Sequence, residues 1–508
     1  HEQQVKEIVR EETGLFVTCG HELSDLLDFR TRAHTAVANG RIVPLLAKLL
    51  RDLERVLRER GIRAPIAVVK GDGTLIGKAA ALERPVETIL SGPAASVAGA
   101  RVLTGLDDAV VVDMGGTTTD VATIEGGTVK VSGSGSDVGG CRTHVRALEI
   151  GTTGLGGDSF LAWRQGCLEI GPRRVAPVAW LGARERGTGK ALDFLAGRLD
   201  SFKGSTRHMQ IVARTGEGDG LPLSAEEREI LAALKERPAS LPELAEATGI
   251  SHLGLLPLSR LEEHHVIQRC GFTPTDLLNT ARAANLWDAD ASRRMSALHG
   301  EIVGVETGRM VENLWEEIVR KLALVLLKNQ LGGDTDTLDR CAGCRRLMGS
   351  IMEGGNRNFG LRVNMRLPFI GIGAPVHHFL PRAAALLGAE VVLPDHADVA
   401  GAIGAVMSRI EVRRQLKIQP GDRGGFMLEG LAGARHFTDF ERASESAEGA
   451  LVDMVRETAR AFGTSEEAVE VDFEDHIVPL GDGTQLFLGR TLTGRLVGEP
   501  DLVLARAG

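Results

Sequence analysis

Residues 113–120 read Asp-Met-Gly-Gly-Thr-Thr-Thr-Asp and constrain the fold more than any other segment. Because they lie between the apolar runs Ala109–Val112 and Val121–Ile124, we predict a tight turn between two strands. Gly115 and Gly116 let the backbone turn sharply and approach an anion without a Cβ in the way. The threonines add hydroxyl donors, and the terminal carboxylates can organise a metal ion or a water. The pattern predicts a phosphate-binding hairpin. The alternative, an ordinary glycine-rich hairpin, needs only one or two of these residue types.

This hairpin resembles a nucleotide signature of the actin, sugar kinase and Hsp70 ATPase superfamily, and it is most similar to the version in the hydantoinase A and 5-oxoprolinase family. Four further segments resemble that family, in the same order along the chain. They are Leu90–Ala100, similar to a Ser-Gly-Pro-Ala segment; Gly154–Ser159, similar to Gly-Ala-Gly-Gly-Gly-Ser with Asp158 replacing a glycine; Gly371–His378, similar to Gly-Gly-Ala-Gly-Pro-Leu-His; and Asp398–Val406, similar to the small-residue helix that ends the ATPase core.

Local patterns predict an α/β fold. Apolar residues at helical spacing predict a helix over Ile42–Arg60, which Gly61 would end, and the next buried strand is expected over Pro65–Val69. Pro85 is expected in the first turn of the following helix. This order fits the second lobe of an actin-like (ribonuclease H-like) ATPase core, to which we assign residues 1–220 and 272–408, the latter with an apolar helix over Val311–Leu327.

Residues 221–271 change to short helices, starting with a capping-box-like Ser224–Glu227, and have the outline of a winged helix. A helix that reads a DNA groove needs several cationic or amide side chains, whereas Ser251–Arg260 has one arginine and is followed by Glu262 and Glu263. We interpret the insertion as a packing or subunit-contact element, with DNA binding as the alternative. Residues 409–508 alternate strand-like and helical pieces and predict a small C-terminal α+β domain.

One part of the family pattern is not found. Family members open with a first phosphate hairpin, an Asp-x-Gly-Gly-Thr-like turn, and His1–Ile8 instead resembles an interior helix that follows a whole N-terminal subdomain. We therefore expect that subdomain, with half of the phosphate clamp, to be missing from these residues.

The resemblance implies ATP and Mg²⁺ as cofactors. Phosphate oxygens would be bound by backbone N–H groups of Gly115, Gly116 and Thr117 and by the hydroxyls of Thr118 and Thr119. We assign Asp113 to holding Mg²⁺ through water or polarising the attacking oxygen. Asp120 is either a second catalytic carboxylate or a cap of the turn.

Two more segments supply candidate cofactor contacts. Gly156, Gly157 and Asp158 form either a loop beside the nucleotide or substrate, or a simple helix-entry turn. Gly371, Gly373 and Ala374 would let adenine and ribose approach the backbone. The histidines that follow, His377 and His378, are expected to be packed or hydrogen-bonded rather than catalytic.

The resemblance implies an ATP-dependent hydrolase, or its ATP-handling subunit, that opens a small cyclic amide such as a hydantoin or 5-oxoproline by phosphoryl activation. One alternative is the ATP-using subunit of an acetone- or acetophenone-type carboxylase, with a ketone substrate. Another is a non-enzymatic nucleotide-dependent regulator. A second large, hydantoinase B-like subunit is the expected partner, within an oligomer.

Charge and cysteine usage narrow the class of protein. The net charge of −9 provides no basic footprint for nucleic acid and no attraction to an anionic membrane surface. Six cysteines in 508 residues do not form a disulfide framework, so a cytoplasmic location is expected. Cys341 and Cys344 have zinc-ligand spacing but no second pair, so they are either a metal or redox site or isolated thiols.

Overall fold

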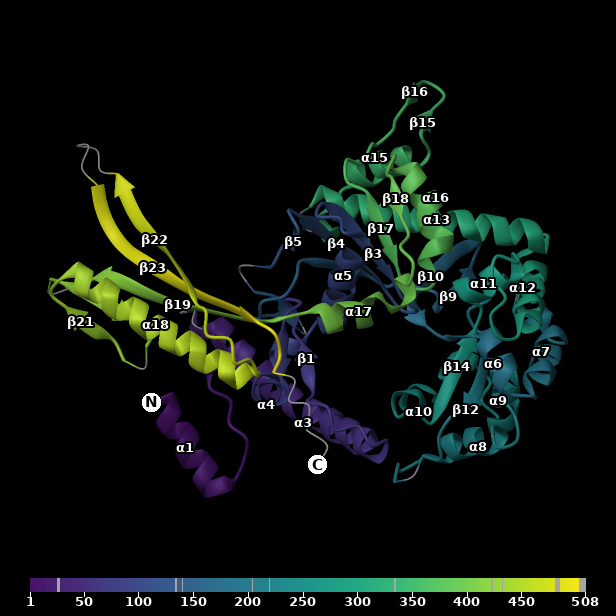
Figure 1. The fold of residues 1–508 in the computed structure, drawn as a ribbon. Helices are drawn as coiled ribbons and strands as arrows, with labels where there is room; N and C mark the ends of the chain where they lie inside the picture. Colours follow the sequence, from purple (N-terminus) through teal and green to yellow (C-terminus); the bar gives the residue numbers. More distant parts are fainter. Residues whose placement is uncertain are drawn as a thin grey trace. The chain divides into compact units, whose positions relative to one another are not determined.

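The computed structural model describes residues 1–24, 28–132, 135–138, 140–202, 204–218, 220–332, 335–421, 424–431, 433–479 and 485–501 (Figure 1). The chain divides into two compact units. Unit 1 consists of residues 1–102, 128–149 and 400–508, and unit 2 consists of residues 103–127 and 150–399. Packing thus groups the chain into two units. The division into four segments expected from the sequence stays a prediction.

The main sheet of unit 2 carries the predicted hairpin. Its strands follow the order β18-β17-β3-β4, with β8 beside β4, and β17 runs parallel to both β18 and β3, whereas β4 is antiparallel to β3 and β8. These strands are β3 (Ala109–Met114), β4 (Thr119–Glu125), β8 (Ile150–Thr153), β17 (Phe369–Ile372) and β18 (Val391–Val392). The strand–turn–strand prediction for residues 109–124 is confirmed.

The helices of unit 2 enclose one large apolar core. Long α13 packs against α16, and α16 packs on β17 and β3, so the apolar helix predicted over Val311–Leu327 is confirmed as part of α13. The helices are α6 (Val178–Arg184), α7 (Thr188–Ala196), α8 (Ala225–Ala233), α9 (Leu241–Thr248), α10 (Ser259–Glu263), α11 (Pro274–Thr280), α12 (Ala289–Val303), α13 (Thr307–Leu331), α14 (Thr335–Arg340), α15 (Ala342–Met352) and α16 (Val376–Leu386), with 3-10 turns η2 (Leu199–Ser201), η3 (Leu253–Leu255) and η4 (Ala397–Val399).

The remaining strands of unit 2 form smaller sheets. Strands β11-β14-β12-β13 form one sheet, and β9 pairs with β10 and β15 with β16. Their bounds are β9 (Ser159–Arg164), β10 (Cys167–Arg174), β11 (Ala176–Pro177), β12 (Ile211–Arg214), β13 (Ala239–Ser240), β14 (Ile267–Gly271), β15 (Gly355–Asn356) and β16 (Phe359–Gly360).

The insertion has its own apolar cluster, which α8, α9 and α10 share with β12 and β14. The predicted capping box is confirmed, because the side chains of Ser224 and Glu227 each accept from the other's backbone N–H at the start of α8. Arg260 Nε donates to Glu227 Oε1 at 2.9 Å, and Arg260 Nη2 donates to the Pro222 carbonyl at 2.6 Å. The single arginine of the Ser251–Arg260 segment is therefore committed to contacts inside the insertion.

Unit 1 is built on a seven-stranded sheet covered by α18. The order is β1-β2-β19-β20-β21, with β23 pairing both β19 and β22. Residues of α18 spaced four apart, from Ala443 to Ala459, are buried in the same cluster as Leu46 and Leu50 of α3. The segment after residue 409 is α+β in content, but its apolar side chains share a core with the N-terminal part of the chain.

The helix predicted over Ile42–Arg60 is confirmed as the C-terminal part of α3, and a strand, β1, lies in the predicted Pro65–Val69 segment. The prediction that this strand is buried was wrong, because Ala67 is exposed and Val68 and Val69 are only half-buried. Gly61 follows α3 with φ of +75°, which confirms it as the stop, and Pro85 opens η1 as predicted. The elements are α1 (Glu2–Thr13), α2 (Gly20–Leu23), α3 (Phe29–Glu59), α4 (Lys78–Glu83), η1 (Pro85–Thr88), α5 (Ser91–Thr104), α17 (Ala400–Met407), α18 (Phe440–Phe462), β1 (Ala67–Val69), β2 (Leu75–Gly77), β5 (Thr128–Val129), β6 (Asp137–Val138), β7 (Cys141–Arg142), β19 (Ile410–Pro420), β20 (Phe426–Glu429), β21 (Arg435–Phe437), β22 (Glu470–Pro479) and β23 (Gln485–Gly498).

Two of the family-like segments become helices that pack together. A Cβ on Gly404 of α17 would lie 1.8 Å from the Ala95 carbonyl oxygen of α5, and one on Gly99 would lie 1.9 Å from the Ala400 oxygen. The small residues of both segments are therefore explained by close backbone contact. In the described part of the chain, no helix is both long and apolar enough to cross a membrane.

Candidate functional site

The Asp113–Asp120 segment forms an antiparallel hairpin in which its two carboxylates face each other. Asp113 at the end of β3 lies directly opposite Asp120 at the start of β4. Residues in directly opposed positions of an antiparallel pair project from the same face of the sheet. The hairpin therefore presents two carboxylates on one face, at the carboxyl end of β3.

The tip of the hairpin exposes backbone donors. The Gly115 N–H closes the turn by donating to the Thr118 carbonyl at 2.9 Å. Gly116 and Thr117 are exposed, and within the described residues their N–H groups donate to no backbone or side-chain acceptor. Of the three N–H groups predicted to bind phosphate, those of Gly116 and Thr117 are thus available to an anion.

The threonine hydroxyls have different surroundings. Thr119 is fully buried, and its hydroxyl donates to the Leu155 carbonyl at 2.6 Å. Thr118 Oγ1 lies 3.4 Å from one oxygen of Asp120, and Thr152 donates to the other at 2.6 Å. The pKa of Asp120 is raised above its ordinary value because burial disfavours the charged form, although these hydroxyls oppose the shift.

The Gly156–Asp158 segment is hydrogen-bonded to the hairpin. The N–H groups of Gly157 and Asp158 donate to the carbonyls of Gly115 and Gly116 at 3.0 and 2.7 Å. A Cβ on Gly156 would lie 2.5 Å from the Gly116 oxygen, so the two backbones are in direct contact. Strand β9, not a helix, follows at Ser159. The helix-entry alternative is therefore wrong, and the segment is a loop that supports the hairpin of residues 113–120 from one side.

Asp158 faces the tip of the hairpin and has a partner that sequence reasoning missed. Its Oδ2 would lie 2.8 Å from a Cβ on Gly116. Arg174 Nη2 and Nε donate to the same oxygen at 3.0 and 3.2 Å. Burial raises the pKa of Asp158, and Arg174 opposes that shift. Arg174 lies in β10 and not beside residues 156–158 in the sequence, so no local pattern pointed to it as a partner of Asp158.

The Gly371–Ala374 segment ends the strand beside β3. Strand β17 runs parallel to β3 and places Ile372 opposite Asp113. Gly373 has φ of +88°, and a Cβ there would lie 2.2 Å from the Met114 carbonyl oxygen and 3.1 Å from Asp113 Oδ1. Ligands in open α/β sheets bind beyond the carboxyl ends of parallel strands, and this edge is such a position.

Not every glycine of this segment reaches the surface. Gly371 is buried, and a Cβ there would lie 2.6 Å from Leu393 Cδ2 and 2.8 Å from Leu380 Cδ2. Packing against these side chains is sufficient to require glycine. Ala374, in contrast, is exposed.

Thr275 joins the Gly156–Asp158 loop to the start of α11. Its N–H and its hydroxyl donate to the Gly157 carbonyl at 3.0 and 2.9 Å. A Cβ on Gly157 would lie 3.0 Å from both Thr275 Oγ1 and Pro375 Cγ. The loop is therefore enclosed by the hairpin, α11 and the segment that begins α16. Thr275 was not among the predicted site residues, because only the fold brings it to the loop.

A buried carboxylate anchors α11. Asp276 is fully buried and accepts hydrogen bonds from the N–H groups of Val178 and Ala179 at 3.1 and 2.9 Å, from the N–H and hydroxyl of Thr273 at 3.1 and 2.8 Å, and from the Ser292 hydroxyl at 2.7 Å. Burial raises the pKa of Asp276, and these donors oppose the shift. The network ties α6, α11 and α12 together behind the loop.

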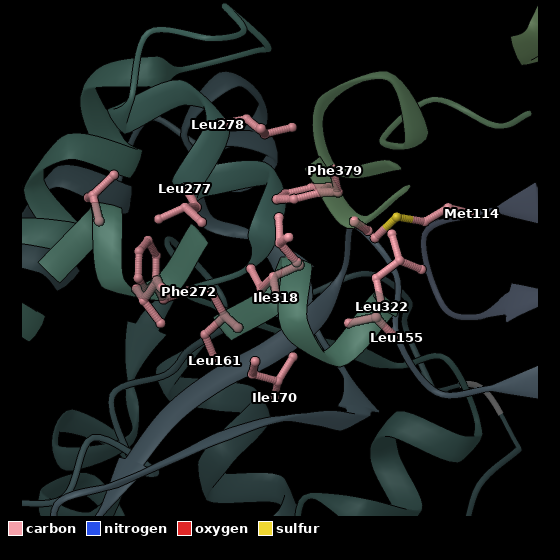
Figure 2. Close-up of a cluster of buried hydrophobic side chains, with 14 of the residues drawn as sticks. Met114, Leu155, Leu161, Ile170, Phe272, Leu277, Leu278, Ile318, Leu322 and Phe379 are labelled. Atoms are coloured by element: carbon pink, nitrogen blue, oxygen red, sulfur yellow. The ribbon is translucent and has the colours of Figure 1, made fainter. Parts of the chain in front are cut away.

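The hairpin is also held from behind by the core. Figure 2 shows Met114, the last residue of β3, together with Leu155 and Leu322 at one side of the cluster of buried apolar side chains. All three are fully buried. Because protein interiors are closely packed, this contact restricts the position of the turn that follows Met114.

The histidines after this segment have unequal surroundings. His377 is exposed, whereas His378 is half-buried, with its ring edge-on to Trp315 at 6.5 Å between centroids. Burial, with a smaller contribution from His377, lowers the pKa of His378. The expectation of a packed ring is met by His378, whereas His377 is exposed.

Comparison with known proteins tests the resemblance to the hydantoinase/oxoprolinase family. Residues 32–181 match the family model described as Hydantoinase/oxoprolinase. The chain is 33% identical over 178 residues to "Caprolactamase subunit alpha" of Pseudomonas jessenii, covering 34% of this chain and 25% of that protein. It is 32% identical over 183 residues to "5-oxoprolinase" of Saccharomyces cerevisiae, covering 35% of this chain and 14% of that one.

The resemblance to the hydantoinase/oxoprolinase family is confirmed. The matched segment contains the hairpin and the Gly156–Asp158 loop, and Gly371–Ala374 lies outside it. The fold extends the similarity over almost the whole chain. The ATP-dependent caprolactamase from Pseudomonas jessenii has a TM-score of 0.53 at 18% identity, and acetone carboxylase in its nucleotide-free structure has a TM-score of 0.51 at 15% identity. These alignments cover 98% and 97% of this chain and 62% of each of the other chains.

The cysteine pair lies at the start of α15, outside the three segments that form the candidate site. Cys341 is the N-cap of α15, and its Sγ accepts the Cys344 N–H at 3.3 Å. Among the residues that the structure describes, the one group of three His, Cys, Asp or Glu ligand atoms within 4.8 Å of one another is Glu2, Cys19 and His21. The capping contact gives Cys341 a local structural role at the start of α15.

Proposed function

We propose that unit 2 binds Mg-ATP and that the chain is the ATP-handling part of a hydantoinase/oxoprolinase-type enzyme acting on a small cyclic amide. The observation that carries the proposal is that three glycine-containing segments meet at one place. Three segments far apart in the sequence, 113–120, 156–158 and 371–374, meet at the carboxyl ends of β3 and β17. An ordinary glycine-rich hairpin would not require two other glycine segments to contact it.

The available donors and carboxylates fit a nucleotide. The N–H groups of Gly116 and Thr117 are exposed at the tip and would bind phosphate oxygens. Asp113 and Asp120 share one face of the hairpin, and carboxylate oxygens, directly or through water, are the ligands that Mg²⁺ prefers. We propose an actin-like core on these grounds, with the adenosine beside Gly373 and Ala374.

ATP, when bound, would supply the phosphoryl group that activates an amide oxygen. The residues of this chain would then contribute positioning and charge neutralisation, which are the main protein contributions to such a transfer. A partner subunit is proposed because one relative is named subunit alpha of a caprolactamase. The likeness to acetone carboxylase supports a second candidate, in which a ketone replaces the cyclic amide.

A regulator that binds DNA through the insertion is less well supported. Helix α10 has five residues, and Arg260 within it is paired with the buried Glu227. An arginine committed to a buried carboxylate is not available for a phosphate or a base edge.

The test is calorimetric titration of Mg-ATP into the chain. We expect saturable binding that is lost in Asp113→Ala and in Gly116→Val. Gly349→Ala is the matched control, because this helical glycine of α15 has open space around the added methyl group. Failure of well-folded wild type to bind would refute the ATP proposal for this chain.

A second assay separates the two substrates. With the partner subunit present, ATP hydrolysis is followed with hydantoin, 5-oxoproline or caprolactam, and separately with acetone plus bicarbonate. Stimulation by a cyclic amide supports the favoured function, and stimulation only by ketone plus bicarbonate supports the carboxylase alternative.

A further inference from the structure

Unit 1 contains a polar cavity that the proposed ATP site does not use. Its volume is about 490 Å³, within the usual range for small-molecule sites, and all of its lining residues belong to unit 1. We call it the Lys70 pocket; Lys70, Asp72, Glu87, Arg146, Arg413 and Phe462 are among its lining residues.

The interior of the Lys70 pocket is buried, ion-paired and balanced in charge. Lys70 is only 7% exposed, and its Nζ lies 3.3 Å from Asp72 Oδ2, 3.7 Å from Glu87 Oε2 and 5.5 Å from the centroid of the Phe462 ring. Arg84 Nη1 lies 3.4 Å from the other oxygen of Glu87. Two cations thus face two carboxylates, and a buried charge set of this kind is held in place by its mutual pairing.

The backbone holds this charge set in a compact turn. The Lys70 N–H donates to the Thr74 carbonyl at 2.7 Å, and the Asp72 carboxylate accepts from the N–H and hydroxyl of Thr74 at 3.1 and 2.6 Å. The Gly71 N–H donates to the Glu87 carbonyl at 2.7 Å, which joins the turn to η1. A preformed interior lowers the ordering cost of binding a ligand.

The remaining side chains of the pocket carry a positive excess. Arg146 and Arg413 are exposed, and among the described residues neither lies within 4.0 Å of a carboxylate oxygen, although Arg146 contributes to the lowered pKa of Asp72. Glu411, which also lines the pocket, is paired with Arg495, whose Nε lies 3.1 Å from its Oε1. Burial lowers the pKa of the lining His144, although Asp28 opposes the shift, so burial disfavours a positive charge on this ring.

We propose that the Lys70 pocket binds a small organic anion whose carboxylate or phosphate group is held by Arg146 and Arg413. The planar guanidinium fork donates two parallel hydrogen bonds to either group, and two unpaired arginines beside a charge-balanced interior select an anion over a cation. This site is independent of the proposed ATP site, because it uses none of the residues of the hairpin, the Gly156–Asp158 loop or β17.

The test is calorimetric titration of the whole chain with two probes, succinate for a carboxylate ligand and inorganic phosphate for a phosphate ligand. We expect saturable binding of at least one probe, weakened at least tenfold in the double variant Arg146→Gln/Arg413→Gln. Arg51→Gln is the matched control, because Arg51 is an exposed arginine of unit 1 outside the pocket lining. The probe that binds identifies the ligand group.

The double variant removes exposed side chains, and circular dichroism would verify that it folds. Binding should also weaken as salt is added, since part of the pocket is open to solvent. Absence of saturable binding for both probes, equal affinity in wild type and double variant, or equal weakening in Arg51→Gln would each overturn the proposal. Phosphate bound at the hairpin would persist in the double variant and would be abolished by Gly116→Val, which likewise counts against the pocket.

Discussion

Replacing Gly373 by alanine tests whether β3 and β17 must meet as closely as the structure shows. The added Cβ would lie 2.2 Å from the Met114 carbonyl oxygen, a backbone atom that cannot rotate away, and 3.1 Å from Asp113 Oδ1. The residue also has φ of +88°, in the left-handed region that L side chains disfavour. The substitution therefore combines backbone strain with a steric overlap at the proposed metal-binding carboxylate.

The two costs can be separated by a matched variant. Gly105 has φ of +67° but nothing within 4 Å of its would-be Cβ, so Gly105→Ala carries only the strain, about 1–2 kcal/mol. Overlap in a closely packed region adds about 1–3 kcal/mol, so Gly373→Ala should lower the free energy of unfolding by about 2–5 kcal/mol. The excess over Gly105→Ala measures the contact between the strands.

Urea unfolding followed by tryptophan fluorescence reports on unit 2 alone. The chain has four tryptophans, and Trp163, Trp180, Trp287 and Trp315 all lie in unit 2. Calorimetry with Mg-ATP provides the functional measurement, in which Gly373→Ala should lose affinity and Gly105→Ala should keep it. Equal stabilities of the two variants, together with unchanged ATP binding in Gly373→Ala, would refute the reasoning.

Three further substitutions test other parts of unit 2. His299 is fully buried with no hydrogen-bond partner among the described residues for either ring nitrogen, and burial lowers its pKa to about 3. The free energy of unfolding should therefore decrease as pH falls below 6.5, by about 5 kcal/mol at pH 3, because the unfolded chain binds a proton that the folded chain does not. His299→Leu should abolish this pH-dependent loss and raise the free energy of unfolding at pH 7 by about 1–3 kcal/mol. Urea midpoints measured across this pH range would show both effects. Thr119→Val should cost about 1–3 kcal/mol because the buried Leu155 carbonyl loses its donor, whereas Thr117→Val, at an exposed hydroxyl, should leave the urea midpoint unchanged. The pKa of Asp120 is raised in the folded state, so the wild type should lose stability relative to Asp120→Asn as pH rises from 3.8; parallel pH profiles for the two proteins would contradict this.

Sequence reasoning succeeded where the determinants are local. The hairpin of residues 109–124 was predicted because apolar runs and turn residues adjoin each other along the chain. The capping box at Ser224 and the stop at Gly61 depend on a few neighbouring residues. In each case the interaction spans only a few positions, so its signal survives in a linear reading.

Sequence reasoning failed where the role of a residue depends on a partner that only the fold brings close. Thr119 was assigned to phosphate, yet its hydroxyl is buried against Leu155, and the helix-entry alternative for residues 156–158 was wrong because a strand follows. Arg174 and Thr275 were not singled out at all. Thr275 is 118 residues from Gly157, and Arg174 reaches Asp158 only because β10 folds back on β9; no periodicity or spacing connects either residue with its partner.

The sequence by itself determined which segments turn, which cap a helix, and which family the chain resembles, because these depend on residue types within a few positions. Tertiary structure alone decided that residues 113–120, 156–158 and 371–374 share one edge of a sheet, and that Gly371 packs inward while Gly116 and Thr117 remain exposed. It also decided that residues after 409 complete the core begun by α3. The physical reason is that burial and close backbone contact are properties of pairs of distant segments, which packing alone brings together.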